Sequence, residues 1–424
     1  MNIITHESRF LGEKYYETTL QNGLRVTVLP KPGYATAYAL YGTRYGSIDT
    51  AFRLAGEQDY TEVPEGIAHF LEHKLFESEE LDAFERFSKT GAYANAYTSF
   101  DRTCYLFACT SNFSENLGIL LDFVQSPYFT AESVQKEQGI IGQEIRMYDD
   151  EPQWRVMFNL LQAMYKNHPV RIDIAGTEQS IAEIDHELLY KCYRTFYNPA
   201  NMFICIAGNV DADAVFAQIE AAVKSGDGRA IERSAHEEPA GVQKPYVEQQ
   251  LSVSQPMFCM GFKERCDRPL TTLRERLESN ILLDIIAGEC SPLFGRLLDE
   301  GLIGEELGTE FFNGYGYAAT LFDGESRDPA AVRDALLAEI ERLRREGVDE
   351  QDFIRSKNGL YGQTIMQYNH VEQIGSALVG AVMGDYDLFS VADEIAAITP
   401  ADIERRLRET MDTERFAMSV ILPK

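Results

Sequence analysis

A short pattern of a helix followed by a strand occurs twice in the 424-residue sequence, once in each half. Ile181-Ala-Glu-Ile184 begins a predicted helix, and a predicted strand containing Phe203 follows it. Ile395-Ala-Ala-Ile398 and Phe416 repeat this arrangement 214 and 213 residues later. A near-constant separation over two successive elements indicates an internal duplication. Two unrelated domains with similar α+β endings are the alternative.

A segment with the composition of a linker lies between the two copies. Residues 224–244 are charged, contain Gly, Ser and Pro, and show no hydrophobic periodicity. A chain of this length suits two domains of about 200 residues each. The sequence therefore predicts an α+β protein with domains at residues 1–223 and 245–424 and a linker at 224–244.

Composition limits the partners and the compartment. The formal net charge of −28 disfavours nucleic acid and anionic membranes, although high solubility is the simpler explanation of that charge. The N-terminal residues lack the apolar core of a signal peptide, and no apolar run approaches the length of a membrane span. Seven cysteines without paired spacing are typical of reduced thiols. We therefore expect a cytoplasmic protein that binds neither nucleic acid nor membranes.

The segment His69-Phe-Leu-Glu72-His73 carries the most specific chemical signal in the sequence. On a helix, positions i, i+3 and i+4 share one face, so both imidazoles can bind one small cation. Zn²⁺ is the usual metal for such a nitrogen site with an open coordination position. Glu72 shares this face and can act on a water at the metal, which is the inverted order of the H-E-x-x-H motif. Two structural histidines beside a carboxylate are the alternative.

A second predicted helix, at residues 130–149, offers the further ligand that a catalytic zinc needs. Its Glu137 and Glu144 are two helical turns apart and share a face, although each could also lie on a solvated surface. Gly139 and Gly142 each cost about 1 kcal/mol relative to Ala inside a helix. We therefore expect another part of the protein to pack closely against this backbone.

These motifs resemble the pitrilysin family of zinc metallopeptidases, the inverzincins that include insulin-degrading enzyme and mitochondrial processing peptidase. The resemblance extends over the whole chain and is strongest with half-length bacterial proteases that are encoded in pairs. Besides the two motifs above, it is carried by Asn22-Gly-Leu-Arg-Val26, Leu71-Glu-His-Lys-Leu-Phe76, Asn95-Ala-Tyr-Thr98, His168-Pro-Val-Arg-Ile-Asp173 and Tyr197-Asn-Pro-Ala-Asn-Met202.

The resemblance implies a duplicated fold, in which two homologous α/β-sandwich domains face each other across a peptide-binding cavity. It implies that His69, His73 and Glu144 bind Zn²⁺. It also implies that Glu72 is the general base, and that Glu137 is a further catalytic carboxylate behind the ligands or beside the substrate.

The segment from Asn95 through Ala96 and Tyr97 to Thr98 is implied to bind substrate. It would form an edge strand that pairs with the backbone of an extended peptide, which gives affinity without a strong sequence preference. Ordinary hairpin packing is an equally good explanation for Tyr97.

The second half lacks the metal motif, because the residues 214 positions after it are Leu283, Ile286 and Ala287. Full-length relatives carry an Arg and a Tyr in this half that contact the substrate. The resemblance places Leu298 and Gly304 at those two positions. It therefore implies a homologous partner subunit that supplies the missing Arg and Tyr. A homodimer, or Arg296 and Tyr315 acting from a rearranged loop, are alternatives.

The expected function is a zinc-dependent endopeptidase that cleaves unfolded peptides, such as a leader or propeptide, as the catalytic subunit of a heterodimer. A peptide-binding or scaffold subunit with little activity of its own is the alternative. A purely structural zinc site is disfavoured because such sites use four protein ligands, usually including Cys, and no Cys lies near His69 in the sequence.

Overall fold

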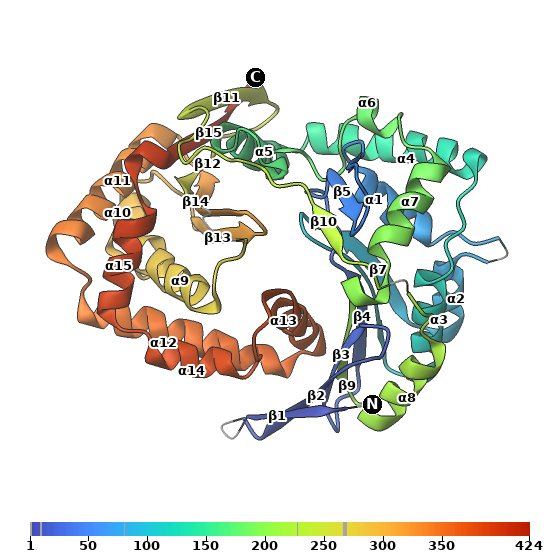
Figure 1. Cartoon of the computed structure of the whole chain (residues 1–424). Helices are drawn as coiled ribbons and strands as arrows, with labels where there is room; N and C mark the ends of the chain where they lie inside the picture. The colour runs from blue at the N-terminus through green and yellow to red at the C-terminus, as the bar shows by residue number, and fades with distance from the viewer. Residues whose placement is uncertain (1, 9–10, 80, 227, 266–268) are drawn as a thin grey trace. The chain divides into compact units, whose positions relative to one another are not determined.

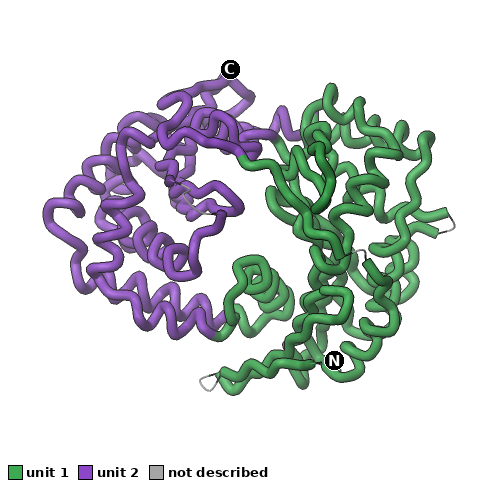
Figure 2. Tube along the Cα trace, in the orientation of Figure 1, with its two compact units in different colours: residues 1–145, 173–235, 367–389 green, residues 146–172, 236–366, 390–424 purple. Residues whose placement is uncertain are grey.

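The structure, a computed structural model, describes residues 2–8, 11–79, 81–226, 228–265 and 269–424. The chain forms two compact units (Figure 2). Unit 1 consists of residues 1–145, 173–235 and 367–389, and unit 2 of residues 146–172, 236–366 and 390–424. Each unit is therefore built mainly from one half of the sequence and takes one short segment from the other half.

Unit 1 contains a seven-stranded sheet with the strand order β1-β2-β3-β9-β4-β8-β7 (Figure 1). Strand β3 pairs with β9 in parallel, and the other neighbours are antiparallel. Central strands β4 and β9 are buried along their whole length, because both faces of the sheet are covered. The strands are β1 (Ile4–Ser8), β2 (Glu13–Thr19), β3 (Arg25–Pro30), β4 (Ala37–Thr43), β7 (Tyr93–Thr98), β8 (Thr103–Cys109) and β9 (Met202–Gly208).

Helices cover both faces of this sheet. One face forms an apolar core with helices from the first half of the chain. The other face packs against α13 (Val371–Gly384), where Gly375 lets the ring of Tyr38 approach so closely that a Cβ would lie 2.4 Å from it. The helices from the first half are α1 (Ile67–Leu75), α2 (Ala83–Thr90), α3 (Phe113–Val124), α4 (Ala131–Asp149), α6 (Glu178–Ile181), α7 (His186–Phe196) and α8 (Ala212–Ala222).

Unit 2 repeats this plan on a five-stranded sheet with the order β11-β15-β12-β14-β13. Strand β11 pairs with β15 in parallel and the other neighbours are antiparallel, as in β3-β9-β4-β8-β7 of unit 1. The strands are β11 (Tyr246–Leu251), β12 (Met257–Lys263), β13 (Gly308–Gly314), β14 (Tyr317–Glu325) and β15 (Phe416–Pro423). The predicted α+β fold with two related domains is confirmed.

Helices also cover both faces of the sheet in unit 2. One face packs against α5 (Pro152–Met164), which comes from the first half of the chain. The other face forms an apolar core with helices of the second half. These are α9 (Leu273–Ala287), α10 (Pro292–Asp299), α11 (Pro329–Glu346), α12 (Glu350–Met366), α14 (Ser390–Ala397) and α15 (Pro400–Thr410). None of the helices in the described ranges combines the length and apolar character needed to cross a bilayer.

Part of the predicted linker at 224–244 has regular structure. Residues Ile231–Arg233 form β10, which pairs antiparallel with β5 (Ala51–Leu54) beside the short strand β6 (Thr61–Glu62). The side chain of Arg233 also contacts the buried carboxylate of Asp49. The predicted domain limits, 1–223 and 245–424, stay a prediction. They divide the chain into two duplicated halves, whereas the compact units group residues that contact one another in space.

The second part of this segment is attached to unit 2 through Lys263. Its buried ammonium donates hydrogen bonds to Glu238 Oε1 at 2.6 Å and to the carbonyl oxygens of Pro239 and Gly241 at 2.7 and 3.1 Å. An ammonium offers three donors, so these partners satisfy a charge that would otherwise be costly to bury.

Limited proteolysis with trypsin should therefore begin after Arg229 and reach Arg233 later. Arg229 lies in an exposed segment without regular structure, and its ion pair with Glu57 is long, at 3.6 Å. Arg233 instead lies in a paired strand and contacts the buried carboxylate of Asp49 at 2.5 Å. A protease needs a locally unfolded backbone, and breaking β10 costs its strand pairing. Mass spectrometry of the first fragments checks the order. Cleavage after Arg233 first, or first cuts inside α1 or α9, would contradict it.

Candidate metal centre

Helix α1 places His69, Glu72 and His73 on one face. The helix begins after Gly66, whose φ of 87° is left-handed, and a Cβ at this position would lie 2.3 Å from the carbonyl oxygen of Ala175. Only glycine fits this entry to the helix. The remaining residues of α1 are largely buried and apolar, so the helix lies inside unit 1 and its polar residues are held rigidly.

Helix α4 brings the carboxylate of Glu144 to the two imidazoles. Glu144 Oε1 lies 3.7 Å from Nε2 of His69, and Glu144 Oε2 lies 3.4 Å from Nε2 of His73. One ligand atom from each residue lies within 4.8 Å of the others. Ligands at zinc–ligand distances of about 2.0–2.2 Å in a tetrahedral site are about 3.3–3.6 Å apart. The three predicted ligands therefore fit a zinc ion with little rearrangement.

Glu137, one of the two carboxylates on α4, lies behind the imidazole of His73. Its Oε1 is 3.0 Å from Nδ1 of His73, so this nitrogen donates to Glu137 and Nε2 is left as the acceptor. A carboxylate that fixes the tautomer of a histidine in this way is typical of zinc ligands. Nδ1 of His69 is also buried, but it has no hydrogen-bond partner among the described residues.

The two imidazoles have opposite electrostatic surroundings. Burial, followed by the neighbouring His73, lowers the pKa of His69 to about 3, so its ring is neutral near pH 7, as a metal ligand must be. Burial also lowers the pKa of His73, but the hydrogen bond to Glu137 and the nearby carboxylates outweigh this effect and raise it overall. A cation at the site would instead favour the neutral form of both rings.

Glu72 is held by a residue from the neighbouring strand. It is only 8% exposed, and its Oε2 accepts a hydrogen bond of 2.9 Å from Oγ1 of Thr98, the last residue of β7. Burial raises the pKa of Glu72, while His73 and the hydrogen bond from Thr98 lower it, and the net shift is upward. A carboxylate with a raised pKa is suited to accept and return a proton.

Strand β7 forms the end of the seven-stranded sheet and pairs only with β8 in the described part of the chain. Its residues alternate between exposed and half-buried positions, with Asn95 and Tyr97 on the exposed side. Asn95 uses its side chain locally, since it donates to the hydroxyl of Tyr93 at 3.2 Å and accepts from the backbone of Ala96 at 2.9 Å. No described strand pairs with the other edge of β7.

The structure corrects one expectation about α4 and adds one contact to the predicted site. Close packing against the backbone at Gly139 was expected, but Gly139 is exposed and a Cβ there would meet nothing within 4 Å; only Gly142 is buried. The contact between Thr98 and Glu72 was not predicted. It joins a strand to a helix 26 residues earlier, and no periodicity in the sequence reports such a contact.

In unit 2, the helix that corresponds to α1 is α9, and its equivalent positions are apolar. Leu283, Ile286 and Ala287 are all buried in the core of this unit. Within the described ranges, His69, His73 and Glu144 form the one cluster of His, Cys, Asp and Glu side chains that could hold a metal ion.

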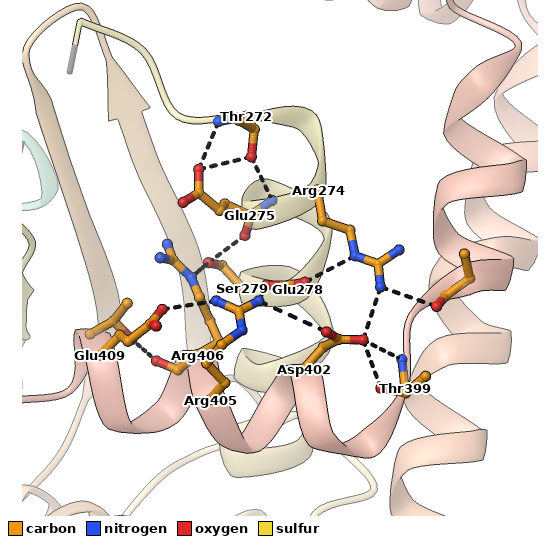
Figure 3. Close-up of polar contacts among 12 residues, drawn as sticks. Thr272, Arg274, Glu275, Glu278, Ser279, Thr399, Asp402, Arg405, Arg406 and Glu409 are labelled. Atoms are coloured by element: carbon orange, nitrogen blue, oxygen red, sulfur yellow. Dashed lines mark hydrogen bonds and ion pairs between the residues drawn. The ribbon is translucent and has the colours of Figure 1, made fainter.

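The polar residues of α9 instead form ion pairs with α15 (Figure 3). Glu278 is fully buried and accepts hydrogen bonds from Arg274 at 2.9 Å and from Arg405 at 2.7 Å. Arg406 is also buried, and it donates to Ser279 and to both carboxylate oxygens of Glu264. These contacts satisfy the buried charges and fix the two helices together.

The structure also describes the two positions at which full-length relatives carry an Arg and a Tyr, and the two residues considered as substitutes for them. Arg296, on α10, lies 3.5 Å from the buried carboxylate of Glu339. Leu298 is 44% exposed on the same helix, and a Cβ at Gly304 would meet nothing within 4 Å. Tyr315 is 46% exposed in the turn between β13 and β14.

Two protein-family profiles match the chain. The profile described as insulinase (peptidase family M16) matches residues 55–178, which include all the candidate metal, base and strand residues. The profile described as the peptidase M16 inactive domain matches residues 183–360.

Similar proteins cover nearly the whole chain. The uncharacterized zinc protease YmfH of Bacillus subtilis is 39% identical over 419 residues, which are 98% of each sequence. The uncharacterized zinc protease YmxG of the same organism is 23% identical over 427 residues, covering 96% of this chain and 97% of YmxG.

A solved structure also matches along its full length. The M16-like peptidase from Alicyclobacillus acidocaldarius has a TM-score of 0.93 and 36% sequence identity, covering 99% of this chain and 100% of that one. Pitrilysin has a TM-score of 0.76 at 15% identity, and this likeness shows the fold alone. It covers 99% of this chain but 46% of the pitrilysin chain.

Proposed function

The chain belongs to the insulinase family of peptidases, family M16, and we propose that it is a zinc-dependent endopeptidase that cleaves unfolded peptides. The observation that carries the proposal is the convergence of two imidazole nitrogens and the carboxylate of Glu144 at zinc-ligand spacing. Glu72 lies on the same face of α1 as the two histidines, where a catalytic base is needed.

His69, His73 and Glu144 would hold the zinc ion, and Glu137 would keep His73 in the tautomer that presents Nε2. Zinc at this place would act as a Lewis acid on the peptide carbonyl and lower the pKa of a water to about 7. Glu72 would accept the proton of the attacking water and return it to the leaving amine. The hydroxyl of Thr98 would hold the Glu72 carboxylate in position for both transfers.

The free edge of β7 would bind the substrate backbone as an added strand. Main-chain pairing accepts many sequences, so an unfolded peptide, such as a leader or propeptide, is the proposed substrate class. The net charge of −28 would favour basic peptides over acidic ones.

We further propose that a homologous subunit completes the active enzyme. The predicted positions of the Arg and Tyr are occupied by Leu298 and Gly304, and Arg296 lies against Glu339. A peptide-binding or scaffold subunit with little activity is the second candidate function, and the match to an inactive-domain profile over residues 183–360 favours it. The complete set of metal and base residues in the first half favours the enzyme.

Purified protein should contain one zinc ion per chain after dialysis, because the described residues offer one metal cluster. His73→Ala should lose the metal, and Glu144→Gln should bind it more weakly, because an amide oxygen carries no charge. Metal analysis by mass spectrometry measures both. His370→Ala is the matched control, since His370 is exposed and its side chain makes no capping hydrogen bond. Wild-type protein that takes up no zinc even when zinc is added would refute the assignment.

A further inference from the structure

The outer edge of β7, which is the edge away from β8, has three residues whose backbone groups point outward. In an antiparallel pair, one residue directs its N–H and C=O to the partner strand, and the next residue directs both away. Just beyond the strand, the N–H of Ser99 donates to the carbonyl oxygen of Arg102 at 2.8 Å, so Ser99 is an inward-directed residue. The alternation then places the backbone groups of Ala94, Ala96 and Thr98 on the outer edge. A peptide that pairs with β7 must use these groups.

The central donor of this edge already has an acceptor. The N–H of Ala96 donates to Oδ1 of Asn95, the preceding residue, at 2.9 Å. A backbone N–H offers a single hydrogen, so the carbonyl of a peptide would need the position that Oδ1 of Asn95 holds. In the chain without a peptide, the side chain of Asn95 therefore covers the place at which a peptide backbone would pair.

Tyr93 holds the side chain of Asn95 in this position. Nδ2 of Asn95 donates to the hydroxyl of Tyr93 at 3.2 Å. The two residues are two positions apart in the strand, so their side chains project from the same face. Tyr93 is 63% exposed and Asn95 is also exposed, so this pair can rearrange without disturbing the core.

The residues that face the other way fix the backbone of β7. Ala94 and Ala96 pack against the apolar core of unit 1, and Thr98 donates a hydrogen bond of 2.9 Å to Glu72. A rotation of the Asn95 side chain therefore changes which acceptor the N–H of Ala96 meets, while the strand stays in place.

We propose that Asn95 is a displaceable cap on β7, that Tyr93 holds the cap closed, and that an extended peptide replaces it at the N–H of Ala96. The inference rests on the proposed function of β7 as the strand to which the substrate is added. Such a cap lowers the affinity for peptides, because its hydrogen bonds must break before the peptide pairs. It also covers a donor that would otherwise pair with other extended chains.

Peptide binding to the Glu72→Gln chain tests the cap, because this chain is expected to bind a peptide without cleaving it. An uncharged, labelled peptide without proline is titrated with the protein and followed by fluorescence anisotropy. Added Asn95→Ala removes the cap and should tighten binding about two- to tenfold. Asn95→Asp keeps an acceptor and gives it a charge, so it should weaken binding about two- to tenfold. Asn358→Ala changes an exposed asparagine on α12 and should bind like the parent.

Tyr93→Phe removes the hydroxyl and keeps the ring. Alone, it should tighten peptide binding about twofold, because Asn95 loses one partner. Combined with Asn95→Ala, it should add nothing, because the hydroxyl acts through Asn95. An equal gain in both backgrounds would show that Tyr93 contacts the peptide itself, and its role in the cap would be wrong.

Ala96→Pro tests whether the peptide binds at this edge. The substitution removes an N–H that takes no part in the pairing with β8, and edge strands tolerate proline in this orientation. Peptide affinity should fall about tenfold, while the zinc content and the thermal midpoint stay close to those of the parent. Should this variant fail to fold, the opposite shifts of the two Asn95 variants still decide.

The outcomes separate this inference from the proposed function. If the Glu72→Gln chain binds no peptide, or if folded Ala96→Pro binds it unchanged, β7 is not the substrate strand and the cap is wrong with it. If binding depends on Ala96 but Asn95→Ala weakens it, Asn95 contacts the substrate directly. The cap is then wrong, whereas the proposed function stands. Unchanged affinity in both Asn95 variants would also refute the cap.

Discussion

Glu72→Gln is expected to abolish peptide hydrolysis while the protein still folds and binds zinc. The amide is nearly isosteric with the carboxylate, and its oxygen can accept the hydrogen bond that Thr98 donates to Glu72. It cannot accept the proton of the attacking water, and general base catalysis typically contributes about 10²–10⁴-fold to a rate. His69, His73 and Glu144 are unchanged, so the zinc content should be that of the wild type.

Cleavage of a quenched fluorescent peptide, measured beside the zinc content, tests this expectation. Glu85→Gln is a suitable control, because Glu85 is an exposed carboxylate on α2, the next helix along the chain. It should retain full activity. A Glu72→Gln variant with zinc and near wild-type cleavage would show that another group is the base. Loss of zinc in this variant would instead indicate that Glu72 contributes to metal binding.

The duplicated fold could be predicted from the sequence because an internal duplication separates similar segments by a nearly constant number of residues. The expectation that residues 181–184 and 395–398 begin helices was wrong, because Ile181 is the last residue of α6 and Ile395 lies in the last turn of α14. The helices that follow these segments are α7 and α15, and the strands with Phe203 and Phe416 are β9 and β15. These two strands occupy the same position in their sheets, beside the parallel partners β3 and β11. A helix and a strand were therefore sufficient to align the two halves.

The exchange of helices between the two units could not be predicted in the same way. Helix α5 comes from the first half and covers the sheet of unit 2, whereas α13 comes from the second half and covers the sheet of unit 1. Each helix has an apolar face, and such a face shows only that the helix packs against something. Which sheet it covers depends on the path of the chain in space.

Some residues of the candidate site could be predicted from local sequence patterns, and others could not. Helical periodicity alone placed His69, Glu72 and His73 together, since i, i+3 and i+4 share a face in any helix. Glu144 lies 71 residues after His73, and its assignment depended on a family resemblance. The resemblance left Glu137 either behind the ligands or beside the substrate, and the structure places it against Nδ1 of His73. The contact of Thr98 with Glu72 joins two elements in space, and only the structure shows it.

Adding the homologous partner should raise the peptidase activity of this chain by about 10²-fold or more, since substrate positioning and an oxyanion donor are each worth about that much. Arg296, on the same helix as Leu298, lies 3.5 Å from the buried carboxylate of Glu339. Leu298 is exposed and apolar, and Gly304 has no side chain, so neither residue can donate a side-chain hydrogen bond to a substrate.

The experiment mixes this chain with the homologue encoded beside it, if that homologue carries the Arg and Tyr, and measures cleavage of one peptide over a range of ratios. Activity should rise and saturate at equal amounts of the two chains. A partner with both residues changed to Ala should bind but not activate. The Glu72→Gln chain with intact partner should remain inactive, which assigns the chemistry to this chain. If this chain alone were as active as the mixture, the missing Arg and Tyr would be unnecessary for activity, and the proposal of a heterodimer would be wrong.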